Sequence, residues 1–176
     1  MRWFFYEARR LLKPGCCCCG GGGAGGGSDP QFVRWSLWLD KVLDFKQMVI
    51  WDKGPIGMGW HYRRSYETVL VAMKPGEACK SYQDSQQIEN IIRTGNRGIK
   101  KFIPSKDQHP TEKPTALAAH FIGLHTEAND LVVDPFMGSG STLQAAKSLR
   151  RRAIGIELNE PFCAMAAKRM AQEILL

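Results

Sequence analysis

The stretch VVDPFMGSGST, residues 132–142, decides the fold predicted for this chain. It starts with β-branched residues that favour a strand, and it continues through an aspartate and a phenylalanine to glycines at positions 138 and 140. Glycine allows a tight turn and a close approach of backbone to a ligand. The next residues, STLQAAKSLR, have a helical pattern. We therefore predict a strand, a glycine turn and a helix, with Asp134 at the carboxyl end of the strand.

A second strand and helix follow in RAIGIEL (152–158) and EPFCAMAAKRMAQEIL (160–175), with Asn159 as the expected N-cap. An amphipathic helix is predicted before both strands, over residues 114–125. The two strands are continuous apolar runs, which are typical of strands buried on both faces of a parallel sheet. The alternation predicts an α/β fold with right-handed crossovers.

The N-terminal half also contains both predicted helices and predicted strands. The patterns predict, in order, a helix over residues 3–12, a buried strand over the cysteines 16–19, a flexible glycine-rich loop over 20–30, a helix over 30–45, and strands over 46–53 and 66–74. Residues 75–112 are polar and irregular and carry several lysines and arginines. Such a segment either contacts a partner or is simply solvated.

The length and composition of the chain limit the class of protein. With 176 residues, of which 44% are hydrophobic, the chain is predicted to form one domain with its own core. Four of the six cysteines are contiguous, which is neither a disulfide framework nor a complete zinc site. No apolar run approaches the length of about 20 residues that spans a bilayer, and the N-terminus lacks a secretory signal pattern. We expect a cytoplasmic protein without a membrane partner.

The charge favours a polyanionic partner. Lysine and arginine number 24 against 17 acidic residues, so the formal net charge is +7. Nucleic acid is the leading candidate partner for such a surface, although a solvated basic surface explains the charge equally well.

Two acids fall where ligands bind in an open α/β sheet, beyond the carboxyl ends of the strands. Asp134 ends one predicted strand and Glu157 ends the next. The glycine turn and the helix after it offer backbone N–H groups to a carboxylate, while Glu157 can accept hydrogen bonds from ribose hydroxyls. These features predict a pocket for a nucleoside with an amino-acid tail. A dinucleotide is less well served, because Leu143 stands at the third glycine position, and a tight turn plus a surface acid would explain either feature alone.

Three motifs carry a resemblance to a known family. HPTEKP (109–114), DPFMGSGST (134–142) and GIEL (155–158) occur in the order and spacing of S-adenosylmethionine-dependent DNA methyltransferases that modify an exocyclic amine, adenine N6 or cytosine N4. The chain resembles the permuted class, in which the cofactor half comes last. LLKPG, VIWDK and YETVLVAMK resemble that family's earlier segments, so the similarity spans most of the chain.

The resemblance implies a fold, a cofactor and a partner. The fold is a single Rossmann-like methyltransferase domain over residues 1–176, with a mostly parallel sheet and its cofactor half at 109–176. The implied cofactor is S-adenosylmethionine, and the implied partner is double-stranded DNA. The implied biological role is DNA methylation in a restriction-modification system. Carried over residue by residue, the cofactor-binding positions are Lys113, Pro114, Asp134, Phe136, Gly138, Gly140 and Glu157. Residues 76–108 correspond to a short target-recognition insertion.

One expected motif is missing from the sequence. Family members position the amine with a D-P-P-Y type loop, which normally precedes the LKPG segment, but no such loop occurs here. SDPQF (28–32) departs from the pattern, and we interpret Asp29 as a helix cap. No catalytic residue is therefore assigned, and the sheet is expected to be incomplete at the N-terminus.

Three explanations of the missing motif are open: a truncated gene product, which we favour, a fragment of a longer reading frame, and a protein completed by another chain. A homo-oligomer is a separate open prediction. Two alternative functions are also open. One is an inactive remnant that binds DNA or the cofactor, and the other is an RNA or small-molecule methyltransferase on the same fold.

Overall fold

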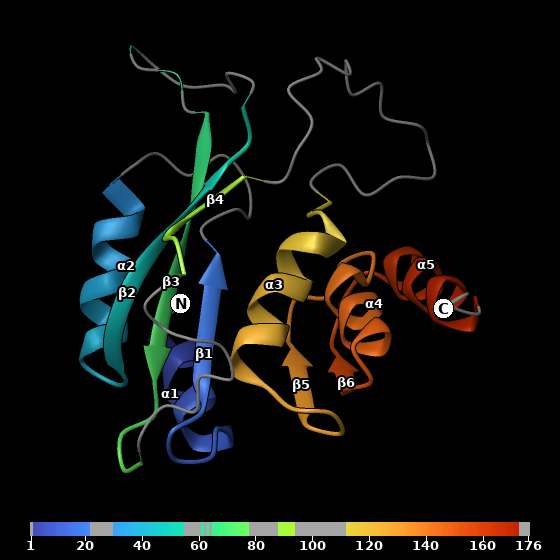
Figure 1. Ribbon diagram of the computed structural model, residues 1–176, viewed down its shortest axis with the longest axis horizontal. Coiled ribbons are helices and arrows are strands. Elements are labelled where there is room, and N and C mark those ends of the chain that lie inside the picture. The colour runs from blue at the N-terminus through green and yellow to red at the C-terminus, as the bar shows by residue number, and fades with distance from the viewer. Residues whose placement is uncertain are drawn as a thin grey trace. The chain divides into compact units, whose positions relative to one another are not determined.

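The computed structural model describes residues 2–21, 30–54, 61, 63, 65–77, 88–93 and 112–172. The chain divides into two compact units, Met1–Ile99 and Lys100–Leu176, which we call the N-terminal and C-terminal units (Figure 1). The single domain expected from the sequence stays a prediction. Within the described ranges, no helix combines the length and the apolar character needed to cross a bilayer.

The N-terminal unit contains a four-stranded sheet among its described residues. Its elements are α1 (Arg2–Leu11), β1 (Cys17–Gly21), α2 (Pro30–Asp40), β2 (Asp44–Asp52), β3 (Tyr66–Met73) and β4 (Ile91–Arg93), and the strand order is β1-β3-β2-β4. β3 pairs antiparallel with β1 and with β2, while β4 pairs parallel with β2. Three of the four strands therefore share one direction, and β3 is the exception. α2 connects β1 to β2 and lets both strands run the same way.

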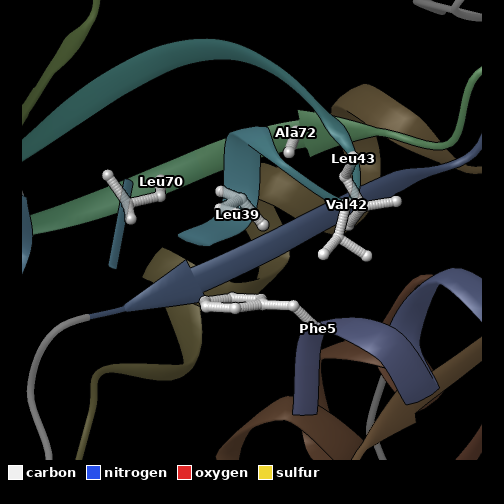
Figure 2. Packing of buried hydrophobic residues seen from close by; sticks show 6 residues of the cluster. All are labelled: Phe5, Leu39, Val42, Leu43, Leu70 and Ala72. Atoms are coloured by element: carbon white, nitrogen blue, oxygen red, sulfur yellow. The ribbon is translucent and has the colours of Figure 1, made fainter. Parts of the chain in front are cut away.

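The core of the N-terminal unit lies between its two helices and the sheet. Six buried residues form it, shown together in Figure 2: Phe5, Leu39, Val42, Leu43, Leu70 and Ala72. Burial of a leucine side chain contributes about 1.5–3 kcal/mol. The predicted helix over 30–45 is confirmed as far as Asp40, and the two apolar residues of the turn after it still enter the core.

The cysteine and glycine segment differs in part from its prediction. A strand does form there, but it starts at Cys17 and continues through Gly20 and Gly21, which pair with Leu70 and Val69. The predicted loop over 20–30 is wrong at these two glycines, because β3 provides backbone partners for them. The predicted burial of the cysteines is wrong at Cys16, because this residue precedes the strand and is exposed. Residues 22–29, including the predicted cap Asp29, lie outside the described residues.

The C-terminal unit, yellow to red in Figure 1, follows the predicted order of elements. They are α3 (Thr115–His125), β5 (Leu131–Asp134), α4 (Ser141–Ser148), β6 (Arg152–Gly155) and α5 (Glu160–Ala171). β5 and β6 pair in parallel, as predicted, with Val132 opposite Ala153. Ile122 of α3 packs with Ala145 and Ala146 of α4 and with Val132. The helix connecting the two strands therefore packs against β5 at Val132, whereas Ala153 of β6 is exposed.

The other face of β5 and β6 corrects the prediction that both strands are buried. Leu131 and Val133 of β5, Ile154 of β6 and Ile156 just after β6 are 43–52% exposed. Successive side chains of a strand point to opposite faces, and the core under α3 and α4 takes only the alternate residue, Val132. A continuous apolar run therefore does not imply burial of both faces here.

Two histidines of α3 have lowered pKa values. Burial lowers the pKa of His120. Burial is also the larger cause of the lowered pKa of His125, and the charge of His120 lowers the pKa of His125 further.

No cluster of three His, Cys, Asp or Glu suited to a metal ion occurs among the residues that the structure describes.

These histidines predict a loss of stability in acid. A lowered folded-state pKa means that folding favours the neutral imidazole. The resulting stability is complete above the unfolded pKa of about 6.5 and declines as the pH falls through the folded-state value. We expect the unfolding midpoint to fall by a few degrees between about pH 7.5 and about pH 5, and less so in His125→Gln. Thermal unfolding followed by circular dichroism measures this, and parallel pH curves for the two proteins would contradict it.

Candidate functional site

The turn after β5 is held by hydrogen bonds from backbone amides. Asp134 is the last residue of β5, and its Oδ1 accepts a hydrogen bond from the Phe136 amide at 3.0 Å. The Gly140 amide donates to the Met137 carbonyl at 2.8 Å. α4 then starts at Ser141, with Gly140 as its N-cap. The predicted strand, glycine turn and helix are confirmed.

Both glycines of the turn have left-handed backbone conformations. Their φ angles are +51° at Gly138 and +85° at Gly140, a region that residues with a Cβ rarely adopt. A Cβ on Gly140 would also lie 2.9 Å from the Cβ of Ala166 on α5. The sequence pattern predicts a role for this glycine in ligand binding. The structure adds a requirement from helix packing, which the sequence pattern did not reveal.

Glu157 lies directly against the glycine turn. Its Oε2 accepts a hydrogen bond from the Gly138 amide at 3.1 Å. Its Oε1 accepts from the amides of Leu158 and Asn159 at 2.8 and 2.9 Å. Asn159 is the N-cap of α5 as predicted, but its side chain makes no capping hydrogen bond. The carboxylate therefore orders its own loop and the turn after β5 together.

The parallel ladder continues beyond the two strands and brings their ends together. The Ile156 amide donates to the Asp134 carbonyl at 2.9 Å, and the Met137 amide donates to the Ile156 carbonyl at 3.1 Å. Gly155 lies just before this point, inside the GIEL motif. A Cβ there would overlap Met137 and would lie 2.9 Å from Leu143 Cδ1. The signal for it was a glycine inside an otherwise apolar strand.

The segment before α3 holds the two remaining cofactor candidates. Lys113 and Pro114 precede the helix, and the Thr115 hydroxyl is hydrogen-bonded to Gln144 Oε1 of α4 at 3.1 Å. On the other side, Glu112 forms an ion pair with Arg169 of α5, with 2.7 Å between Oε1 and Nη2. Sequence reasoning missed this pair, since nothing local connects its members.

The structure brings the predicted positions together to different degrees. Asp134, Gly138, Gly140 and Glu157 belong to one hydrogen-bonded unit, and the Phe136 side chain beside them is exposed. Residues 109–111 lie outside the described residues. So does most of the predicted target-recognition insertion, of which only residues 76–77 and 88–93 are described.

The family follows from a comparison with protein-family models. Residues 1–168 match the N6/N4 methyltransferase family described as DNA methylase. The chain belongs to this DNA methylase family. The resemblance drawn from the three motifs is thereby confirmed. The solved structures compared below confirm the Rossmann-like methyltransferase fold.

Individual relatives agree with the family. The chain is 34% identical over 122 residues to the type II methyltransferase M2.DpnII of Streptococcus pneumoniae, a match that covers 64% of this chain and 45% of that protein. It is 28% identical to the protein in the crystal structure of the M1.HpyAVI–SAM complex, with a TM-score of 0.76, covering 97% of this chain and 82% of the other.

A putative DNA modification methylase from Thermus thermophilus has a TM-score of 0.71 at 26% identity, covering 97% of this chain and 76% of the other. The matches to two curated type II methyltransferases cover 45% and 44% of those proteins, so the chain spans about half the length of the curated relatives it matches.

We predict that Gly140→Ala destabilises the C-terminal unit. A left-handed alanine costs about 1–2 kcal/mol, and its Cβ would press against Ala166. Gly123→Ala is the matched control, because that glycine lies within α3 and a Cβ there meets nothing within 4 Å. The control is expected to gain about 0.5–1 kcal/mol. Urea unfolding measures both changes, and an unchanged midpoint for Gly140→Ala would refute the packing argument.

Proposed function

We propose that this chain binds S-adenosylmethionine at the turn after β5 and acts as a DNA amino-methyltransferase. The reaction transfers the cofactor's methyl group to an exocyclic amine of DNA, adenine N6 or cytosine N4. The observation that carries the proposal is the hydrogen bond from the Gly138 amide to Glu157. It joins the glycine turn and the acid at the carboxyl ends of two adjacent parallel strands, where ligands of such sheets bind.

The donors and acceptors present fit this cofactor. Glu157 supplies a carboxylate for the ribose hydroxyls, while the start of α4 offers backbone N–H groups to the amino-acid tail. Phe136 lines the methionine side in this proposal, and Lys113 and Pro114 close over the ligand from the start of α3. When bound, the cofactor supplies an electrophilic methyl group on a sulfonium.

The comparisons support the choice of cofactor and substrate. The M1.HpyAVI structure, 28% identical to this chain, is a complex with SAM. The relative from Streptococcus pneumoniae is a type II methyltransferase. The net charge of +7 suits a DNA backbone. We propose double-stranded DNA as the partner, residues 76–108 as the part that reads it, and the cytoplasm as the location. We also propose that the chain works with a further protein partner, which is either a second copy of itself or a different chain that completes it.

A second candidate function is binding of cofactor and DNA without methyl transfer. The observation that favours it is the lack of a D-P-P-Y type segment in the sequence, since that segment would hold the amine. The first candidate has the support of the family as a whole. The two differ in chemistry but share the same cofactor site.

Titration calorimetry with S-adenosylmethionine tests the shared site. We predict that Glu157→Gln weakens binding about tenfold or more, because a charge-assisted hydrogen bond contributes about 1.5–3 kcal/mol. Glu160→Gln is the matched control, as Glu160 lies in the first turn of α5, and it is expected to bind as the wild type does. Equal affinities for wild type and Glu157→Gln, or no binding by either, would remove the basis of the proposal.

Transfer of a labelled methyl group separates the two candidates. We expect incorporation into double-stranded DNA, with the label on adenine N6 or cytosine N4 after digestion. A salt-sensitive shift of DNA in gels without incorporation would instead support the binding function. Preference for RNA in a competition experiment would point away from DNA as the substrate.

A further inference from the structure

Helix α5 contacts the glycine turn at two positions that are one helical turn apart. Ala166 leaves no space for a Cβ on Gly140. Arg169, three residues later, places its Nη1 at 3.4 Å from the Ser139 hydroxyl oxygen and 3.3 Å from that of Ser141. Both serines are buried. The guanidinium group therefore bonds to the residues on either side of Gly140.

The same guanidinium reaches a distant segment of the chain. Its Nη2 lies 2.7 Å from Oε1 of Glu112, which is 57 residues away in the sequence. The side chains of Arg169 and Glu112 are only 23% and 29% exposed, unlike the surface pair of Arg10 and Glu7 at 67% and 55%. Partial burial reduces solvent screening, so we expect this pair to hold its geometry better than a surface pair does.

The two contacts of Arg169 fix one end of a short segment whose other end is fixed separately. Glu112 is held by α5 through Arg169, and Thr115 is held by α4 through Gln144. Lys113 and Pro114, the residues proposed to close over the cofactor, lie between these two attachments. These two contacts attach the segment to α5 and to α4, the helices that pack on and follow the glycine turn.

We propose that Arg169 is a positioning residue for the cofactor site. It holds residues 112–114 in a fixed place relative to residues 138–140, and the affinity for S-adenosylmethionine depends on it. This inference rests on the proposed function. The physical reason is preorganisation: a ligand that must first order a loose segment binds more weakly than one that meets an ordered segment. Arg169 need not contact the ligand.

The test compares cofactor affinity in three variants by titration calorimetry. Arg169→Gln removes the charge and the fork of donors, and we expect about tenfold weaker binding. Arg169→Lys keeps the charge but not the fork, so it is expected to recover part of the affinity. Lys168→Gln, a change of charge at the neighbouring exposed position of α5, is the matched control and is expected to stay within about twofold of the wild type.

A double-mutant cycle with Glu112→Gln tests whether Arg169 affects cofactor affinity through its ion pair with Glu112. If Arg169 acts through Glu112, the double variant is expected to bind about as weakly as Arg169→Gln alone, because the second change removes nothing further. Losses in affinity that multiply independently would overturn this route.

Hydrogen exchange of the ligand-free proteins gives a readout that is independent of binding. In Arg169→Gln, we expect faster exchange in the peptide covering residues 112–119 than in the wild type or in Lys168→Gln. A purely structural role predicts a different result: faster exchange confined to α5 and a lower melting temperature, with cofactor affinity unchanged. That result would overturn the inference.

The failures of the two proposals are distinguishable. If the wild type binds the cofactor and Arg169→Gln binds equally well, the positioning role is wrong and the proposed function stands. If the wild type binds no cofactor, the proposed function fails and the positioning role fails with it.

Discussion

The hydrogen bond between the Gly138 amide and the Glu157 carboxylate is the interaction on which the candidate site depends. It connects two loops that leave the sheet from neighbouring strands, and the same carboxylate accepts two amides of its own loop. A carboxylate that accepts several backbone N–H groups holds them at fixed separations. Together with the backbone hydrogen bonds between residues 134–137 and Ile156, this side chain joins the loops after β5 and β6 into one hydrogen-bonded unit at the strand ends.

Helix α5 provides the second constraint on that surface. Its Ala166 fits against Gly140 only because the glycine has no side chain, and Arg169 then reaches the serines on both sides of it. Close packing of a helix on a turn is possible where both contact residues are small. The left-handed φ of Gly140 serves the same end, since it directs the chain into α4 at the point where α5 crosses. Turn geometry and helix packing thus require the same residue for two separate reasons.

Much of the fold and part of the site could be predicted from local sequence. Strand residues followed by glycines and a helical pattern predicted the turn at 134–140, and Asp134 was correctly placed at the end of β5. Glu157 was predicted to end the next strand, but it lies two residues beyond the end of β6 and accepts a hydrogen bond from the Gly138 amide there. The burial of β5 and β6 was predicted wrongly. A run of apolar residues shows that a face can be buried, but the neighbouring elements decide whether it is, and in the described residues α3 and α4 cover only one face.

By itself, the sequence determined the strand, turn and helix at the centre of the C-terminal unit, because those preferences act over a few neighbouring residues. It also determined the family, since three motifs in order rarely coincide by chance. The tertiary structure alone decided which side chain meets Gly140 and which partner Arg169 finds 57 residues away. Such contacts depend on how separate elements pack, and no periodicity along the chain encodes the distance between them.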